Sequence, residues 1–200
     1  MKLNFKRQEK NKKRFSVFSD GEYLFSVSEY TFVNEGLYDG IEIEDMDLFE
    51  KRCIEKEHYN YCLNILSKNS YTKKSIEEKL KRRGCLEKVS EKIIEKLIKN
   101  GLICDDDYKE RYIFSAQMYK KTGHKKIKQE LYLKGITAED EDFDMELERK
   151  NVVLLVKKLL DSKTDTKKII TRLLSKGYSF SHIKEAIENF GECEYNYEEY

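Results

Sequence analysis

The feature that most constrains the fold of this chain is one spacing of two apolar residues and a glycine, which occurs three times. The three copies are Ile76, Leu80 and Gly84, then Ile127, Leu131 and Gly135, then Ile169, Leu173 and Gly177. Apolar residues four apart share one face of a helix, and a glycine beyond them favours the left-handed conformation that ends a helix. Thr72, Gly123 and Asp165, four residues before the isoleucines, are residue types that begin helices. The repeat therefore predicts three short helices with the same start, buried face and end.

Longer apolar patterns with a helical period lie on both sides of each repeated helix. They cover residues 49–66 and 89–98, residues 105–119 and 137–147, and residues 152–160 and 183–190. Asp105 is expected to cap the helix that opens the second group, and a further helix is expected after Thr137. We therefore predict three three-helix units, over residues 45–101, 102–148 and 149–191. The isoleucines that open the repeat are 51 and 42 residues apart, so the units do not form a solenoid of fixed period.

Residues 1–44 carry a different pattern, which is that of a small β-sheet. β-branched and aromatic residues stand on both sides of Asp20-Gly21, a dipeptide that favours the positive φ angles of a two-residue hairpin turn. Residues 3–8 are expected to add a third strand, and the sheet should lean on the helix that follows, because a sheet this small is marginal alone. The predicted fold is mainly α: three tandem three-helix units in an elongated array, preceded by this β-hairpin or sheet and followed by an acidic tail at residues 192–200.

The sequence lacks the motifs of the common catalytic and membrane-bound classes. No apolar run approaches the length of a membrane span, and residues 1–30 lack a signal peptide, so we expect a cytoplasmic protein. The five cysteines form no C-x-x-C pair, which predicts neither a metal site nor disulfides. No phosphate-binding glycine loop, nucleophile elbow or H-E-x-x-H is present, and the isolated His58, His124 and His182 are expected at surface or boundary positions. We therefore expect a protein that is not an enzyme and uses no cofactor.

The charge of the chain is nearly neutral in total but strongly patterned. Its 39 basic and 38 acidic residues leave a formal net charge of +1. Residues 111–134 nevertheless hold seven basic residues and one acidic residue, whereas residues 137–148 hold seven acidic residues and no basic one. Lysines stand at the start of each repeated helix, where the helix dipole disfavours cations, so local helix stability does not explain them. They predict either a surface for a polyanion or an acidic protein, or a solvated lysine-rich face.

Four stretches of the chain resemble the bacterial regulatory protein family RecX. The first, residues 71–84, reads Tyr-Thr-Lys-Lys-Ser-Ile-Glu-Glu-Lys-Leu-Lys-Arg-Arg-Gly, and the others are residues 93–97, 100–106 and 123–136. The order and spacing of these blocks are specific, although each block alone is not. The hairpin sequence at residues 19–23 also looks like that of the longer family members, so the resemblance extends over nearly the whole chain.

The resemblance implies a non-enzymatic modulator of the RecA recombinase. Such proteins lie in the groove of the RecA filament on single-stranded DNA and limit its growth or promote its disassembly, which lowers ATPase, strand-exchange and coprotease activity. The implied roles are in DNA repair, homologous recombination and SOS regulation, for a monomer that also binds DNA weakly and has no membrane partner. The residues expected to contact phosphates or RecA carboxylates are all basic: Lys73, Lys74, Lys81, Arg82, Arg83, Arg111, Lys120, Lys121, Lys125, Lys126, Lys128, Lys167, Lys168 and Arg172.

Two other functions remain compatible with the same residues. A helix-turn-helix transcription regulator would read DNA bases with one helix, and Gln129 and Asn100 are side chains of the type that it needs. A protein-only adaptor would use the lysines for solubility alone. Four tyrosines lie among the cations, where they would stack on bases or pack in the core: Tyr112, Tyr119, Tyr132 and Tyr178.

Overall fold

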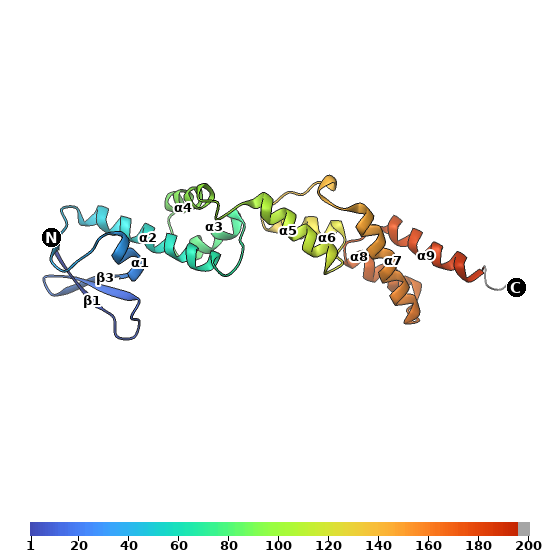
Figure 1. Ribbon diagram of the computed structural model, residues 1–200, viewed down its shortest axis with the longest axis horizontal. Helices are drawn as coiled ribbons and strands as arrows, with labels where there is room; N and C mark the ends of the chain where they lie inside the picture. Colours follow the sequence, from blue (N-terminus) through green and yellow to red (C-terminus); the bar gives the residue numbers. More distant parts are fainter. Residues whose placement is uncertain (196–200) are drawn as a thin grey trace. The chain divides into compact units, whose positions relative to one another are not determined.

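Figure 1 shows the computed structural model, which describes the backbone of residues 1–195 and the side chains of residues 1–190. The chain divides into two compact units, Met1–Ile103 and a second unit that begins at Cys104. An antiparallel sheet and helices make up the first unit, and the described part of the second is helical. The prediction of a mainly α fold with a small N-terminal sheet is confirmed.

The N-terminal sheet has four antiparallel strands in the order β3-β2-β1-β4. The strands are β1 (Lys2–Arg7), β2 (Arg14–Ser19), β3 (Glu22–Ser28) and β4 (Ile41–Glu42). Asp20, with φ of 50°, and Gly21, with φ of 86°, form the predicted turn between β2 and β3. Strand β4 and the short helix α1 (Glu29–Asn34) were not predicted, because each is too short to show a recognisable apolar period.

Helix α2 (Met46–Leu66) packs against the sheet, as expected for a sheet too small to be stable alone. Leu3, Val17 and Val27 come from the three longer strands and are buried in one cluster with Phe49 and Cys53 of α2. Burial of a large aliphatic or aromatic side chain stabilises the fold by about 1.5–3 kcal/mol before conformational entropy is subtracted. The apolar faces of the sheet and of α2 therefore form one core.

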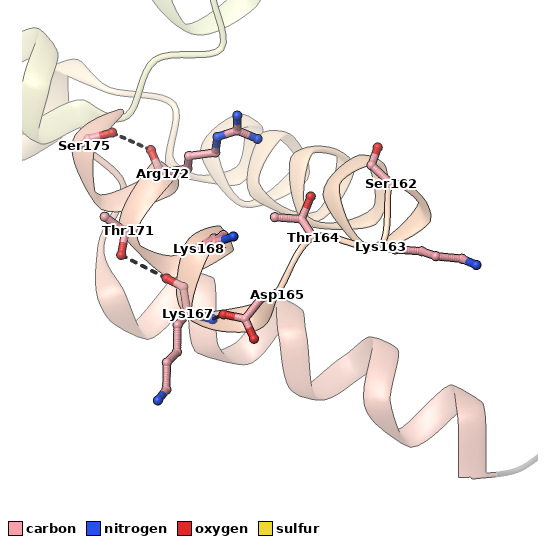
Figure 2. Close-up of a pocket in the computed structure, with 9 residues that line it drawn as sticks. All are labelled: Ser162, Lys163, Thr164, Asp165, Lys167, Lys168, Thr171, Arg172 and Ser175. Carbon is pink, nitrogen blue, oxygen red and sulfur yellow. Dashed lines mark hydrogen bonds between the residues drawn. The ribbon is translucent and has the colours of Figure 1, made fainter.

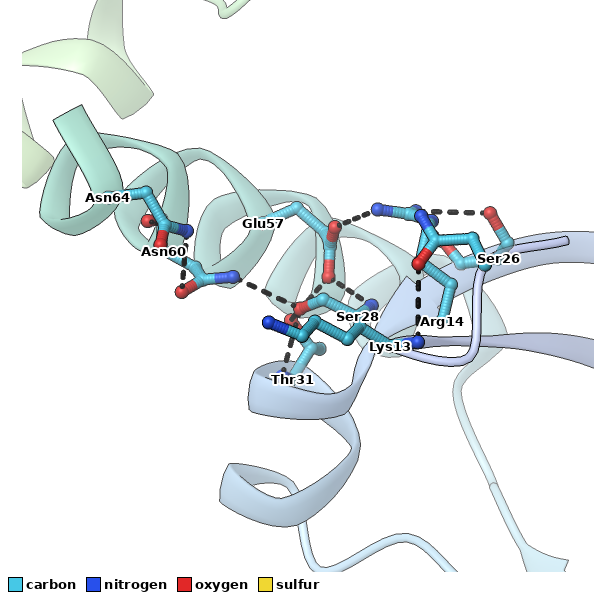
Figure 3. A network of polar contacts seen from close by, with 9 residues as sticks. Lys13, Arg14, Ser26, Ser28, Thr31, Glu57, Asn60 and Asn64 are labelled. Atoms are coloured by element: carbon cyan, nitrogen blue, oxygen red, sulfur yellow. Dashed lines mark hydrogen bonds and ion pairs between the residues drawn. The ribbon is translucent and has the colours of Figure 1, made fainter. Parts of the chain in front are cut away.

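A carboxylate on α2 adds polar links between this helix and the sheet (Figure 3). Glu57 Oε1 accepts hydrogen bonds from Ser28 N and Thr31 Oγ1, both at 2.6 Å, and Glu57 Oε2 pairs with Arg14 Nη1 at 2.9 Å. Burial by itself would raise the pKa of this carboxyl, but the hydrogen bonds and the Arg14 guanidinium outweigh burial and lower the pKa below its ordinary value. One charged group thus joins β2, the end of β3 and the start of α1 to a single point on α2.

The other helices of the first unit are α3 (Lys73–Arg82) and α4 (Glu87–Lys99). Ile76 and Leu80 of α3 are buried in one cluster with Ile93 and Leu97 of α4 and Tyr59 of α2. This cluster is separate from the one beneath the sheet. Helix α2 therefore contributes residues to both cores of the first unit.

The predicted start and end signals of the repeated helices are confirmed. The three helices are α3, α6 (His124–Leu133) and α8 (Thr166–Ser175), and their N-cap residues are Thr72, Gly123 and Asp165. All six apolar residues of the repeat are at most 1% exposed. The glycines that follow have the expected positive φ angles, of 75°, 82° and 88° for Gly84, Gly135 and Gly177.

The second unit also contains α5 (Asp105–Met118), α7 (Met145–Asp161) and α9 (Phe180–Tyr195). Its first core centres on Ile127 and Leu131 of α6, and its second core centres on Ile169 and Leu173 of α8 with Val156 of α7. Helix α9 continues to Tyr195, and the remainder of the acidic tail predicted for residues 192–200 lies outside the described residues.

Three predicted details of the second unit are wrong. The helix expected after Thr137 is absent, because the acidic side chains there bond to nearby backbone and form only a 3₁₀ turn, η1 (Asp140–Asp142). Helix α7 begins at Met145 and runs through the boundary drawn between residues 148 and 149, and its first residues help to cover the core around α6. Asp105 is the first residue of α5 rather than its cap; Cys104 occupies the N-cap position and makes no side-chain capping bond.

Candidate polyanion interface

The lysines at the starts of the repeated helices are exposed in all three cases. They are Lys73 and Lys74 on α3, Lys125 and Lys126 on α6, and Lys167 and Lys168 on α8. None of the three helices has an acidic residue in its first turn, where a carboxylate would interact favourably with the helix dipole. The structure thus confirms that these cations stand where local helix stability does not require them.

Within the second unit, the start of α6 packs directly on the end of α8. Gly123 N donates a hydrogen bond to Lys176 O at 2.9 Å, and Lys125 N donates to Gly177 O at 3.2 Å. A Cβ atom built on Gly123 would lie 2.3 Å from the carbonyl carbon of Gly177, so no residue other than glycine fits this approach. The hydroxyl of Tyr178 donates to Lys121 O at 2.6 Å and closes the same junction.

This junction gathers three lysines from different segments. Lys176 Nζ donates to the carbonyl oxygens of Lys120 and Lys121, at 3.3 and 3.1 Å. Burial, and then the charges of Lys126 and Lys121, lower the pKa of Lys176. Lys121, Lys126 and Lys176 therefore form one positively charged group, which we call the junction cluster.

Lys176 is not among the predicted residues, although the sequence contains a signal for it. A basic residue stands immediately before the glycine in every copy of the repeat, as Arg83, Lys134 and Lys176. The predicted interface includes Arg83 but neither Lys134 nor Lys176. Only the packing of α6 on α8 shows that the residue at the end of one repeat meets lysines at the start of another.

A buried carboxylate holds the first residue of α6 in place. Glu148 of α7 accepts hydrogen bonds from His124 N and from His124 Nδ1, each at 2.8 Å, and His182 Nδ1 lies 3.4 Å from the same oxygen as His124 Nδ1. The expectation that the histidines are isolated surface or boundary residues is wrong for His124, which is 9% exposed. Residues far apart in the chain meet here because α6, α7 and α9 pack together.

The rest of the acidic block at residues 137–148 also folds onto the second unit. Asp140 pairs with Lys128 at 2.8 Å, and Asp142 pairs with Lys109 at 2.9 Å. Asp144 caps α7 by accepting a hydrogen bond from Leu147 N at 2.8 Å. Of the lysines predicted to bind a polyanion, Lys128 is therefore already engaged by an acidic residue of the chain.

A second group of predicted residues lies around a cavity on α8, with a volume of about 730 Å³ (Figure 2). Lys167, Lys168 and Arg172 line it, together with the side chain of Lys163 from the turn before the helix. Asp165 is the one acidic residue in this lining, and its carboxylate accepts a hydrogen bond from Lys167 N at 3.1 Å. The hydroxyls of Ser162, Thr171 and Ser175 in this lining donate to backbone carbonyls, so the lining offers a ligand chiefly its cations.

The remaining predicted residues have varied surroundings. On α3, Lys73 and Lys81 line a groove beside α4, and Arg82 pairs with Glu78 at 3.5 Å. The guanidinium of Arg83 lies 4.2 Å from the centre of a tyrosine ring, that of Tyr61. On α5, Arg111 Nε donates to the carbonyl of Asp107 at 3.1 Å, and Lys120 Nζ lies 5.6 Å above the ring of Tyr112.

Two of the four tyrosines near these cations are available for stacking. Tyr119 is 74% and Tyr132 72% exposed, whereas Tyr178 is buried in the core of α8 and Tyr112 is half-buried with its hydroxyl bonded to Glu130. No group of histidine, cysteine and acidic side chains among residues 1–190 could hold a metal ion. No helix in the described part of the chain is long and apolar enough to cross a membrane.

Comparisons with known proteins match the chain to one family over both units. Residues 4–44 match a family model described as the regulatory protein RecX N-terminal domain, and residues 59–97 match one described as RecX, first three-helix domain. The regulatory protein RecX of Clostridium acetobutylicum is 31% identical over 200 residues, which cover 90% of this chain and 92% of that protein. The regulatory protein RecX of Bacillus subtilis is 29% identical and covers 90% of this chain and 74% of its own length.

Two crystal structures are also similar to the chain. One, of a regulatory protein RecX, has a TM-score of 0.65 and 26% sequence identity, and the match covers 92% of this chain and 98% of the other. The other, of RecX from Lactobacillus salivarius, has a TM-score of 0.60 and 32% identity, and the match covers 68% of this chain and 95% of the other.

Proposed function

The chain belongs to the RecX family of regulatory proteins, and we propose that it binds the RecA filament on single-stranded DNA and restrains RecA activity. The junction cluster of Lys121, Lys126 and Lys176 is the observation that carries this proposal. A regulator of this kind acts by occupying the filament, so it needs a surface for phosphates and acidic side chains rather than catalytic groups.

The junction cluster supports a polyanionic partner because holding like charges together opposes folding. Burial lowers the pKa of Lys176, and the charges of Lys126 and Lys121 lower it further. No acidic side chain among residues 1–190 forms an ion pair with any of the three lysines. A bound phosphate would relieve the repulsion and would gain from charges that are already in place.

The cavity on α8 supports the same partner. Three lysines and an arginine surround it, and cationic side chains of this kind bind phosphate oxygens. Such interactions position a nucleic-acid backbone without reading its sequence, which suits a protein that must act wherever a filament forms. The exposed rings of Tyr119 and Tyr132 would add stacking on unpaired bases.

The proposal is tested by measuring hydrolysis of ATP by RecA in the presence of single-stranded DNA. The protein should slow hydrolysis at substoichiometric to equimolar ratios to RecA, and it should co-sediment with the filament. Unchanged hydrolysis together with no co-sedimentation would refute the proposal. A sequence-specific footprint on duplex DNA would instead indicate a transcription regulator.

A matched pair of variants distinguishes binding at the start of α6 from attraction by the overall charge of the chain. Lys125→Glu with Lys126→Glu places two acids in the first turn of α6, where the helix dipole favours them, so weaker binding would not reflect a weaker helix. The variant should bind single-stranded DNA with a salt dependence whose slope is lower by about 0.7 for each phosphate that is no longer neutralised. Lys157→Glu with Lys158→Glu makes the same charge change at exposed positions of α7 and should retain most of the slope.

A further inference from the structure

Helices α3 and α4 of the first unit enclose a groove that the proposed function does not use. Its volume is about 580 Å³, and residues of both helices and of the link between them line it. Two large apolar side chains of this lining remain at the surface, since Leu86 is 74% and Ile98 45% exposed. Exposed apolar side chains beside a concave surface are typical of a place where another molecule packs.

A buried hydroxyl in the same lining lacks a hydrogen-bond partner. Ser90 is 5% exposed, and none of the described residues supplies a partner for its Oγ atom. A buried polar group left in this state costs about 1–3 kcal/mol, which a bound molecule that supplied the hydrogen bond would recover. The hydroxyl both donates and accepts, and a peptide backbone offers both kinds of group.

The charge of the groove argues against nucleic acid and for a cationic partner. Four of its lining residues are acidic and exposed: Glu77, Glu87, Glu91 and Glu95. Lys73 and Lys81 are the only basic residues in the lining, so the carboxylates outnumber the cations two to one. Such a rim repels phosphates and attracts lysine or arginine side chains.

We propose that this groove binds a peptide segment of a partner protein, with an apolar side chain that enters between α3 and α4 and with lysines or arginines on both sides of it. The apolar side chain would pack against Leu86 and Ile98, the cations would meet Glu91 and Glu95, and the backbone would reach the Ser90 hydroxyl. The surface lies on the first unit, whereas the junction cluster and the α8 cavity belong to the second. The proposal therefore does not depend on binding to RecA or to DNA.

The test uses the full chain and fluorescein-labelled short peptides too short to form a stable helix, with neither RecA nor DNA present. The first peptide has lysines on both sides of a central leucine, the second replaces every lysine by glutamate, and the third keeps the lysines but replaces the leucine by alanine. Fluorescence anisotropy should show binding of the first peptide only, because both the apolar side chain and the positive charge are needed. Equal affinity for the acidic peptide or for the leucine-free peptide would overturn the proposal.

Two variants locate the binding in the groove. Glu91→Lys with Glu95→Lys should weaken binding of the first peptide about tenfold or more, through like-charge repulsion. Glu44→Lys with Glu50→Lys is the matched control: it makes the same charge change at exposed positions of the first unit outside the groove and should leave the affinity nearly unchanged. Equal losses in the two variants would show non-specific attraction and would overturn the assignment.

Ser90→Ala distinguishes binding from folding because it should move the two in opposite directions. Removal of an unsatisfied buried hydroxyl from a helix should keep or raise the free energy of unfolding. Loss of the hydrogen bond to the peptide should weaken its binding by about threefold to tenfold. Unchanged peptide affinity would overturn the role of Ser90, and self-association of the wild-type chain that disappears in the Glu91 and Glu95 variant would show that a second copy occupies the groove instead.

Discussion

Replacement of Gly177 by alanine is expected to open the junction between α6 and α8, whereas the same change at Gly84 is not expected to disturb any neighbour. Both glycines follow a repeated helix and have positive φ, 88° for Gly177 and 75° for Gly84. A Cβ atom on Gly177 would lie 2.4 Å from the Cβ atom and 2.5 Å from the backbone nitrogen of Lys126. A Cβ atom on Gly84 would meet nothing within 4 Å.

The loss of stability expected for each variant follows from these surroundings. Alanine in the left-handed region costs about 1–2 kcal/mol, and this is the whole effect expected for Gly84→Ala. At Gly177 the start of α6 must also move away from α8, because backbone atoms cannot yield as a side-chain end can. The hydrogen bonds from Gly123 N to Lys176 O and from Lys125 N to Gly177 O then break. At about 1 kcal/mol each, they bring the destabilisation by Gly177→Ala to about 3–4 kcal/mol.

The assay is urea unfolding of the two variants and the wild type, followed by circular dichroism, with amide hydrogen exchange as a local readout. Gly177→Ala should lose about 2 kcal/mol more stability than Gly84→Ala, and the amides of Gly123 and Lys125 should exchange faster in that variant alone. Because the junction cluster depends on the same packing, Gly177→Ala should also lower the salt dependence of DNA binding. Equal losses of stability, or unchanged exchange at both amides, would refute the described packing of α6 on α8.

Three further outcomes follow from single side chains. The pKa of Glu57 is lowered from 4.5, so its carboxylate stabilises the fold fully above pH 4.5 and loses this contribution as the pH falls through the lower pKa of the folded state. In thermal unfolding, the loss of stability caused by Glu57→Gln should therefore shrink in that acidic range and stay constant above it. Burial raises the pKa of Cys53 to about 12, whereas Cys104 is exposed; mass spectrometry after brief alkylation should therefore find Cys104 modified and Cys53 intact until the chain unfolds. Lys128 is paired with an aspartate and Lys125 is exposed without an ion pair among the described residues, so Lys125→Gln should weaken DNA binding more than Lys128→Gln in anisotropy titrations; the reverse order would contradict the ion pair.

The sequence contained nearly everything that determines the repeated helices. Each needs only a cap, an apolar pair four residues apart and a residue that tolerates positive φ, and all three signals lie within about a dozen residues. The helix predicted after Thr137 is absent, because that prediction rested on the period of the apolar residues alone. Its aspartates form local bonds to the backbone, as Asp142 does with Glu139 N at 2.8 Å, and these compete with a helix.

The position and exposure of the candidate residues could be predicted only where local sequence determines them. Exposed lysines at helix starts are local features, and α6 and α8 place theirs as expected. Which lysines act together depends on interactions between distant segments, such as that of Lys176 with Lys121, and no periodicity encodes them. Glu148 shows the converse, since a residue that the sequence presented as part of an acidic block is a buried partner of His124.

The acidic block decides which lysines of the second unit can meet a polyanion. Asp140 and Asp142 hold Lys128 and Lys109, and Glu148 is engaged at the start of α6. No described acidic side chain pairs with the junction cluster, so its charge persists although the chain as a whole carries a formal net charge of only +1. Long-range attraction to DNA scales with the total charge, whereas binding at close range scales with the local charge. Such a distribution favours a partner that offers phosphates at matching positions over bare duplex DNA of any sequence.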